Sequence, residues 1–196
     1  MDKKIVFVHI PKAAGASIVR WGKQNNIKNF VNAGHRSLEQ FSKIHPTTEI
    51  DKSFAITRNT YHRMLSLYNF AKNKHIKVMK QVELGKRTLS QEQINWLKKS
   101  IKVWDKGIID YLDFTLEQSL LNHDQLNYIK DVDLIIPYES LNTDFKKIQK
   151  LINCNEPLTQ TVHKYKKKAV VDMSTDYIKC IQKHFAEEID FFQYTP

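Results

Sequence analysis

IVFVHIPKAAGAS, residues 5–17, contains a strand, a turn and the start of a helix in direct succession. Its first part, 5–10, is almost continuously apolar, which predicts a strand buried on both faces of a parallel sheet. A turn is expected at 11–15 and a helix over 16–24. Phosphate-binding loops occur at such junctions, because the loop amides and the positive end of the helix both attract an anion.

The rest of the chain alternates between short apolar runs and amphipathic stretches. Apolar runs predict further strands at 27–31, 53–57 and 132–137. Helical spacing predicts helices at 60–71, 90–104, 115–121, 143–152 and 174–192, and a short one after a capping box at Ser37. The basic stretch 75–86 fits either a mobile segment or a helix. We therefore expect one α/β domain over 1–196, with a P-loop-like, central, mainly parallel sheet flanked by helices.

The composition is that of a folded, basic protein. Hydrophobic residues make up 41% of the chain, which excludes a disordered protein, and the formal net charge is +10. This charge attracts anions such as nucleotides, acidic sugars, nucleic acid or anionic membranes, although a solvated lysine-rich surface would carry the same charge.

Cysteine usage and the ends of the chain suggest a reducing compartment. Cys154 and Cys180 form no CxxC or zinc pattern, and Cys180 fits the apolar face of a helix, so we predict neither a disulfide framework nor a metal site. No apolar leader precedes the first strand, and no run is long enough to span a membrane. The expectation is a cytoplasmic protein.

The turn at 11–15 has the residues that an anion site needs. Lys12 supplies a point charge, Gly15 permits a close backbone approach, and Ser17 can donate a hydroxyl hydrogen bond. The loop is not a Walker A loop, in which the lysine follows the last glycine, so a nucleoside-triphosphate kinase is disfavoured.

A second motif, FAITRNTYHRMLSLY, occupies residues 54–68. Arg58 follows the predicted strand, and its planar guanidinium can bind two phosphate oxygens. Ser66 is eight residues further along a predicted helix. Strand carboxyl ends are where open α/β sheets bind ligands, so both motifs point to one edge of the sheet.

Both motifs resemble those of sulfotransferases that use 3′-phosphoadenosine 5′-phosphosulfate (PAPS). HIPKAAGAS at 9–17 is similar to the HIPKTGGTS loop of the carbohydrate-modifying branch, although it departs at Ala13, at Ala14 and at Ala16, which lacks the family's hydroxyl. The segment 54–68 resembles RDPYERLVSxY, and weaker similarities occur at 122–128, 136–145 and 190–194. The resemblance implies the sulfotransferase fold, PAPS as cofactor with PAP as product, no metal, and a carbohydrate hydroxyl as acceptor.

The resemblance also implies a set of site residues. The cofactor-binding residues would be Lys12, Ala13, Ala14, Gly15, Ala16, Ser17, Arg58, Ser66, Lys166 and Lys168. Lys12 would stabilise the leaving group, and His35 would be the catalytic base, with His62, His123 and Glu139 in reserve. An ordinary surface histidine is the alternative for His35, and a solvated charge run is the alternative for the lysines at 164–168. Loops around 32–48, 72–90 and 105–130 would define the acceptor.

Two other classes of function remain open at this stage. A degenerate sulfotransferase fold could bind a nucleotide or polyanion without turnover, and Ala16 favours that alternative. A nucleic-acid-binding module would suit the charge, but the chain has no recognised nucleic-acid motif, so no nucleic-acid partner is expected.

Overall fold

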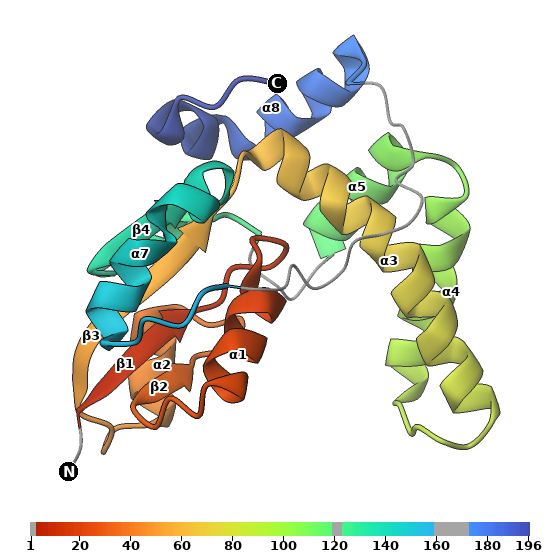
Figure 1. Ribbon diagram of the computed structural model, residues 1–196. Helices are drawn as coiled ribbons and strands as arrows, with labels where there is room; N and C mark the ends of the chain where they lie inside the picture. The colour runs from red at the N-terminus through yellow and green to blue at the C-terminus, as the bar shows by residue number, and fades with distance from the viewer. Residues whose placement is uncertain (1–2, 119–122, 159–172) are drawn as a thin grey trace. The chain divides into compact units, whose positions relative to one another are not determined.

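The computed structural model describes residues 3–118, 123–158 and 173–196 (Figure 1). The chain divides into two compact units. The first, called the sheet unit, comprises Met1–Asn59 and Leu121–Lys166, and the second, called the helical unit, comprises Thr60–Leu120 and Lys167–Pro196. Each unit is described separately.

The sheet unit is built on four parallel strands, β1 (Lys4–Val8), β2 (Phe30–Asn32), β3 (Ile50–Thr57) and β4 (Leu134–Pro137). Their order is β2-β1-β3-β4, with every neighbouring pair parallel (Figure 1). The prediction of an α/β fold with a parallel sheet flanked by helices is therefore confirmed. The second strand lies later than the expected 27–31, because it starts only at Phe30, opposite Ile5 of β1.

Helices cover both faces of this sheet. On one face, α1 (Gly15–Gln24) and α7 (Leu141–Ile152) meet through the rings of Trp21 and Phe145, whose centroids are 5.0 Å apart. On the other face, α2 (Leu38–Ile44) packs Phe41 against Val6 of β1. Adjacent strand residues point to opposite faces, so β1 is buried on both sides, as its continuous apolar run predicts. The short α6 (Leu126–Ile129) and the 3₁₀ turn η1 (Tyr138–Ser140) precede β4 and α7 respectively.

The helical unit consists of α3 (Thr60–Glu83), α4 (Gln91–Trp104), α5 (Ile108–Gln118) and α8 (Thr175–Phe192). The stretch 75–86, for which a mobile segment was one alternative, is helical to Glu83. The prediction for α5 was wrong at its start, since the helix begins at Ile108 and not at 115. Ile108, Tyr111 and Leu112 of α5 are spaced three and four residues apart and pack in the core of the helical unit, as one face of a helix does.

Buried aromatic residues hold the helical unit together. Tyr177 of α8 is fully buried and donates a hydrogen bond of 2.5 Å to the carbonyl oxygen of Tyr61 in α3. Arg63 and Glu188, both with 0% exposed side chains, form an ion pair of 3.2 Å, and the hydroxyl of Thr60 donates to the same carboxylate.

None of the helices in the described ranges combines the length and the hydropathy that a membrane span requires.

Candidate functional site

The loop between β1 and α1 has the backbone of an anion-binding nest. Lys12 (φ 68°) and Ala14 (φ 61°) are both left-handed, on either side of Ala13. Such a conformation costs a non-glycine residue about 1–2 kcal/mol, so the fold holds these two residues there against their preference. Alternating handedness turns successive amides toward one side, which forms a concavity that suits an anion.

The start of α1 adds further hydrogen-bond donors to this loop. Ala14 is the N-cap residue, and it provides no side-chain hydrogen bond to the first turn. Within the described ranges, the amides of Gly15 and Ala16 have no hydrogen-bond acceptor. The first turn contains no acidic residue, so nothing there competes with an incoming anion for the positive end of the helix.

Gly15 is required by a close approach to His9. A β-carbon at Gly15 would lie 1.8 Å from Cδ2 of the His9 ring, so no other residue fits without moving that ring. Burial lowers the pKa of His9 to about 4, and the charges of His35 and Lys12 act in the same direction. His9 is therefore neutral at pH 7, and its ring packs against the start of α1.

His35 follows β2 and is held next to the loop by His9. Its Nδ1 lies 2.9 Å from the carbonyl oxygen of His9, and the two rings are 4.4 Å apart between centroids. In return, the His9 amide donates to the carbonyl oxygen of Gly34 over 3.3 Å. Since a carbonyl oxygen can only accept, Nδ1 carries the hydrogen in this bond, and the neutral ring keeps its lone pair on Nε2. The side chain is exposed, so Nε2 is accessible as a base.

Arg58, at the carboxyl end of β3, reaches the same loop. Its Nη1 donates to the carbonyl oxygen of Lys12 over 3.2 Å, and its guanidinium lies 4.5 Å from the centroid of the Tyr138 ring. The amide side chain of Gln125 binds the Arg58 backbone twice, accepting from its N–H at 2.8 Å and donating to its oxygen at 2.9 Å. Gln125 is fully buried, so these two bonds fix the end of the strand.

The three reserve residues lie in different environments. Glu139 accepts a hydrogen bond of 2.9 Å from the amide of Asn59, which gives it a role in holding the turn after β3. His123 is buried in the sheet unit, with an exposed fraction of 7%, whereas His62 is exposed on α3 of the helical unit.

The structure thus brings one part of the predicted site together. Lys12, the loop residues Ala13–Ser17, Arg58 and His35 lie around the end of β1 in the sheet unit. Ser17 and Ala13 are buried there, and Ala16 is half-buried. Ser66 is half-buried on α3, in the helical unit. Lys166 and Lys168 lie outside the described residues.

Sequence reasoning missed the residues that position Arg58. In the sequence, Gln125 belongs only to the weak similarity at 122–128, and Tyr138 belongs only to the one at 136–145. Neither contact follows a local spacing, since Gln125 is 67 residues from Arg58 along the chain. A buried glutamine is the one available signal, because a fully buried amide needs hydrogen-bond partners.

The chemistry of this arrangement is that of an oxyanion site. It combines a lysine and an arginine with the amides of a helix start, and the imidazole of His35 lies beside them. Charge-assisted hydrogen bonds from such donors are about twice as strong as neutral ones. Cationic side chains and amides suit a phosphate or sulfate group rather than a metal cation.

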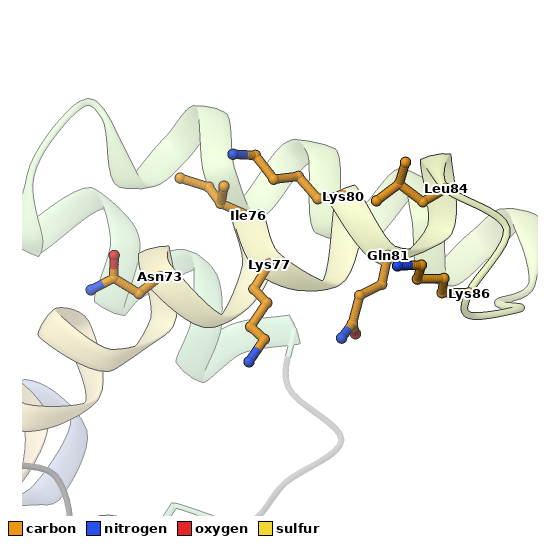
Figure 2. A pocket seen from close by; sticks show the side chains of 7 residues that line it. All are labelled: Asn73, Ile76, Lys77, Lys80, Gln81, Leu84 and Lys86. Atoms are coloured by element: carbon orange, nitrogen blue, oxygen red, sulfur yellow. The ribbon is translucent and has the colours of Figure 1, made fainter.

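A surface pocket of about 420 Å³ lies along α3 in the helical unit (Figure 2). Ile76, Lys80 and Leu84 lie along one side of the helix, and Lys77 and Gln81 along the other. No predicted site residue lines this pocket. It coincides with the segment 72–90, for which sequence reasoning predicted a role in acceptor binding.

In the comparisons with known proteins, the chain matches no family model, no curated protein and no solved structure.

Proposed function

We propose that this chain is a PAPS-dependent sulfotransferase that transfers a sulfonate group to an acceptor hydroxyl, with a carbohydrate as the acceptor class. The observation that carries the proposal is the hydrogen bond of 3.2 Å between Nη1 of Arg58 and the carbonyl oxygen of Lys12. It joins the two sequence motifs at the carboxyl end of adjacent parallel strands, where open α/β sheets bind ligands.

Each residue of the loop has a distinct task in such a reaction. PAPS, when bound, supplies an activated sulfonate whose transfer leaves negative charge on a phosphate oxygen. The ammonium group of Lys12 and the amides of Gly15 and Ala16, at the start of α1, would stabilise that charge. The proton of the acceptor hydroxyl goes to Nε2 of His35, while Nδ1 stays bound to the His9 oxygen.

The remaining cofactor contacts belong to the proposal as predictions. The resemblance assigns the 3′-phosphate to Arg58 and Ser66, with Lys166 and Lys168 closing over it. Arg58 is suited to this task because its guanidinium is already oriented by Tyr138 and by the Lys12 oxygen. A planar guanidinium held in place loses less freedom on binding than an unconstrained one.

A binding protein without turnover is the second candidate, and Ala16 is the observation in its favour. Ala16 lies in the first turn of α1 and offers an amide but no hydroxyl to an anion. The related loop motif has a threonine there, so one contact to the phosphate is lost. Loss of one neutral hydrogen bond costs about 0.5–1.5 kcal/mol, which weakens binding by about 2- to 12-fold and leaves the other donors in place.

The first test is thermal unfolding with and without PAP, the desulfated product. A ligand at about 100 times its Kd stabilises a protein by about 2.7 kcal/mol, which corresponds to a rise in Tm of about 5–10 °C for a chain of this size. Arg58→Ala is expected to abolish the rise, and Arg87→Ala, which removes an exposed arginine of the helical unit, is expected to keep it.

Two outcomes of this test count against parts of the proposal. No rise in the parent at a PAP concentration far above the micromolar range would overturn PAPS use. A rise without sulfonate transfer from PAPS to a panel of carbohydrate acceptors would favour the binding protein.

A further inference from the structure

A cluster of three metal-ligating side chains lies between two helices of the helical unit. Asp113 comes from α5, and Cys180 and His184 come from α8. Their ligand atoms all lie within 4.8 Å of one another. Cys180 and His184 are four residues apart on one helix, so they share a face and both turn toward Asp113.

We propose that Asp113, Cys180 and His184 form a binding site for a divalent transition metal of the zinc type. The donor set is one thiolate sulfur, one imidazole nitrogen and one carboxylate oxygen. Zinc takes these three donors in proteins, whereas calcium and magnesium prefer oxygen alone. Three protein ligands leave a fourth tetrahedral position for water.

The distances lie close to those of a tetrahedral site. Metal–ligand bonds of about 2.0–2.3 Å place the donor atoms of such a site about 3.3–3.6 Å apart. In the structure, Nε2 of His184 is 2.6 Å from Oδ1 of Asp113, and Sγ of Cys180 is 4.0 Å from the same oxygen. To hold a metal, the His184–Asp113 distance must lengthen and the Cys180–Asp113 distance must shorten. Each change is less than about 1 Å, which small side-chain rotations achieve.

A simple ion-pair network is the competing explanation for this cluster. Lys183 is 3.3 Å from the same Oδ1 of Asp113, and its side chain is 62% exposed. Exposed ion pairs of this kind contribute about 0–1 kcal/mol, so Lys183 can leave when a metal enters. An ion-pair network accounts for Lys183 and His184 beside Asp113, but it gives Cys180 no role. A metal site uses the Cys180 thiolate as a ligand, so Cys180 distinguishes the two explanations.

The Cys180 thiol must lose its proton before its sulfur can bind a metal. Burial raises the pKa of Cys180 to about 11, and the negative charge of Asp113 adds to the effect. Without a metal, Cys180 is therefore a protonated core thiol at pH 7. A bound zinc-type ion deprotonates a coordinating thiol outright, so metal binding is expected to release a proton.

The test is a titration of the whole chain with Co²⁺, which reports tetrahedral thiolate coordination by its absorption. We expect a thiolate-to-cobalt charge-transfer band that Zn²⁺ abolishes by displacement. Cys180→Ser is expected to eliminate the band, and Cys154→Ser, which removes the other free cysteine, is expected to leave it unchanged. No band in the parent, or a band that depends on Cys154 and not on Cys180, would overturn the proposal.

A second pair of variants keeps the test valid if Cys180→Ser fails to fold. Lys183→Ala removes the cation that competes for Asp113 and leaves all three ligands. It is expected to tighten Co²⁺ binding several-fold, whereas Lys179→Ala, an exposed lysine one turn earlier on α8, is expected to have no effect. Equal affinities in the two lysine variants would assign the cluster to the ion-pair network. The readout is independent of PAP binding, so this proposal and the proposed function can fail separately.

Discussion

The imidazole of His9 occupies the space where a side chain at position 15 would begin, since a β-carbon on Gly15 would lie 1.8 Å from its Cδ2. This contact couples the residue that follows β1 to the first residue of α1. It also explains why the loop has a glycine at that position, because the His9 ring lies 4.4 Å from the ring of His35 and cannot move far without disturbing the candidate base.

Gly15→Ala is therefore expected to destabilise the fold through His9. Overpacking of this kind costs about 1–3 kcal/mol, which denaturant unfolding would measure. In a His9→Ala background, Gly15→Ala should cost much less, because the clashing ring is gone. Gly22→Ala is the matched control, since its β-carbon would meet the ring of Phe30 at 2.7 Å and His9→Ala should not relieve that contact. An equal cost of Gly15→Ala in both backgrounds would contradict the argument.

His35→Gln tests the base within the proposed function. A glutamine amide can still donate to the His9 oxygen, but it cannot take a proton at neutral pH. Turnover is expected to fall by about 10²–10⁴-fold, while the rise in Tm caused by PAP remains. His45→Gln, at an exposed histidine after α2, should leave turnover unchanged. Turnover of His35→Gln within a few-fold of the parent would show that another group, or water, accepts the proton.

The sequence was most informative where structure depends on neighbouring residues. The sequence pattern at Ser37 and at Ser90 is that of a capping box. The structure contains both capping boxes, with Gln40 and Gln93 as the reciprocal partners. The strand, turn and helix at 5–24 also follow from local composition. Four residues are enough to define a capping box, so no knowledge of the tertiary structure is needed.

The sequence was least informative where one side chain depends on a distant one. The left-handed backbone of Lys12 and Ala14 is imposed by the fold, because neither residue prefers it. Asp113 is 67 residues from Cys180, so the cluster that they form with His184 shows no zinc spacing in the sequence. Only the Cys180–His184 spacing was available, and one such pair is common in helices without a metal.

Acid is expected to destabilise both units through buried histidines. Burial lowers the pKa of His9 and of His75 from 6.5 to about 4, with nearby positive charges acting in the same direction. As the pH falls from about 6.5 to about 4, the unfolded chain takes up these protons before the folded chain does. The free energy of unfolding therefore decreases over that window, by at most about 1.4 kcal/mol per pH unit for each histidine.

The measurement for this prediction is urea unfolding between pH 7 and pH 4.5. His75→Gln, which removes one of the two groups and can keep a hydrogen bond to Ser100, should reduce the pH dependence. His45→Gln should not, because His45 is exposed. A His75→Gln variant with the same pH dependence as the parent would show that His75 takes up its proton equally in both states.

The buried ion pair of Arg63 and Glu188 gives the largest expected change in stability. Both side chains have an exposed fraction of 0%, so Arg63→Met leaves a carboxylate in the core without its cation. Removal of one partner from such a pair costs about 3–5 kcal/mol, whereas replacement of both by apolar residues is often nearly neutral. The double variant with Arg63→Met and Glu188→Leu should therefore recover most of the loss in denaturant unfolding. Lys147→Met is the control, because its partner Asp144 lies 2.8 Å away at the surface, and an exposed pair contributes at most about 1 kcal/mol. If the double variant is as unstable as Arg63→Met alone, the penalty comes from lost packing around the guanidinium and not from an unpaired charge.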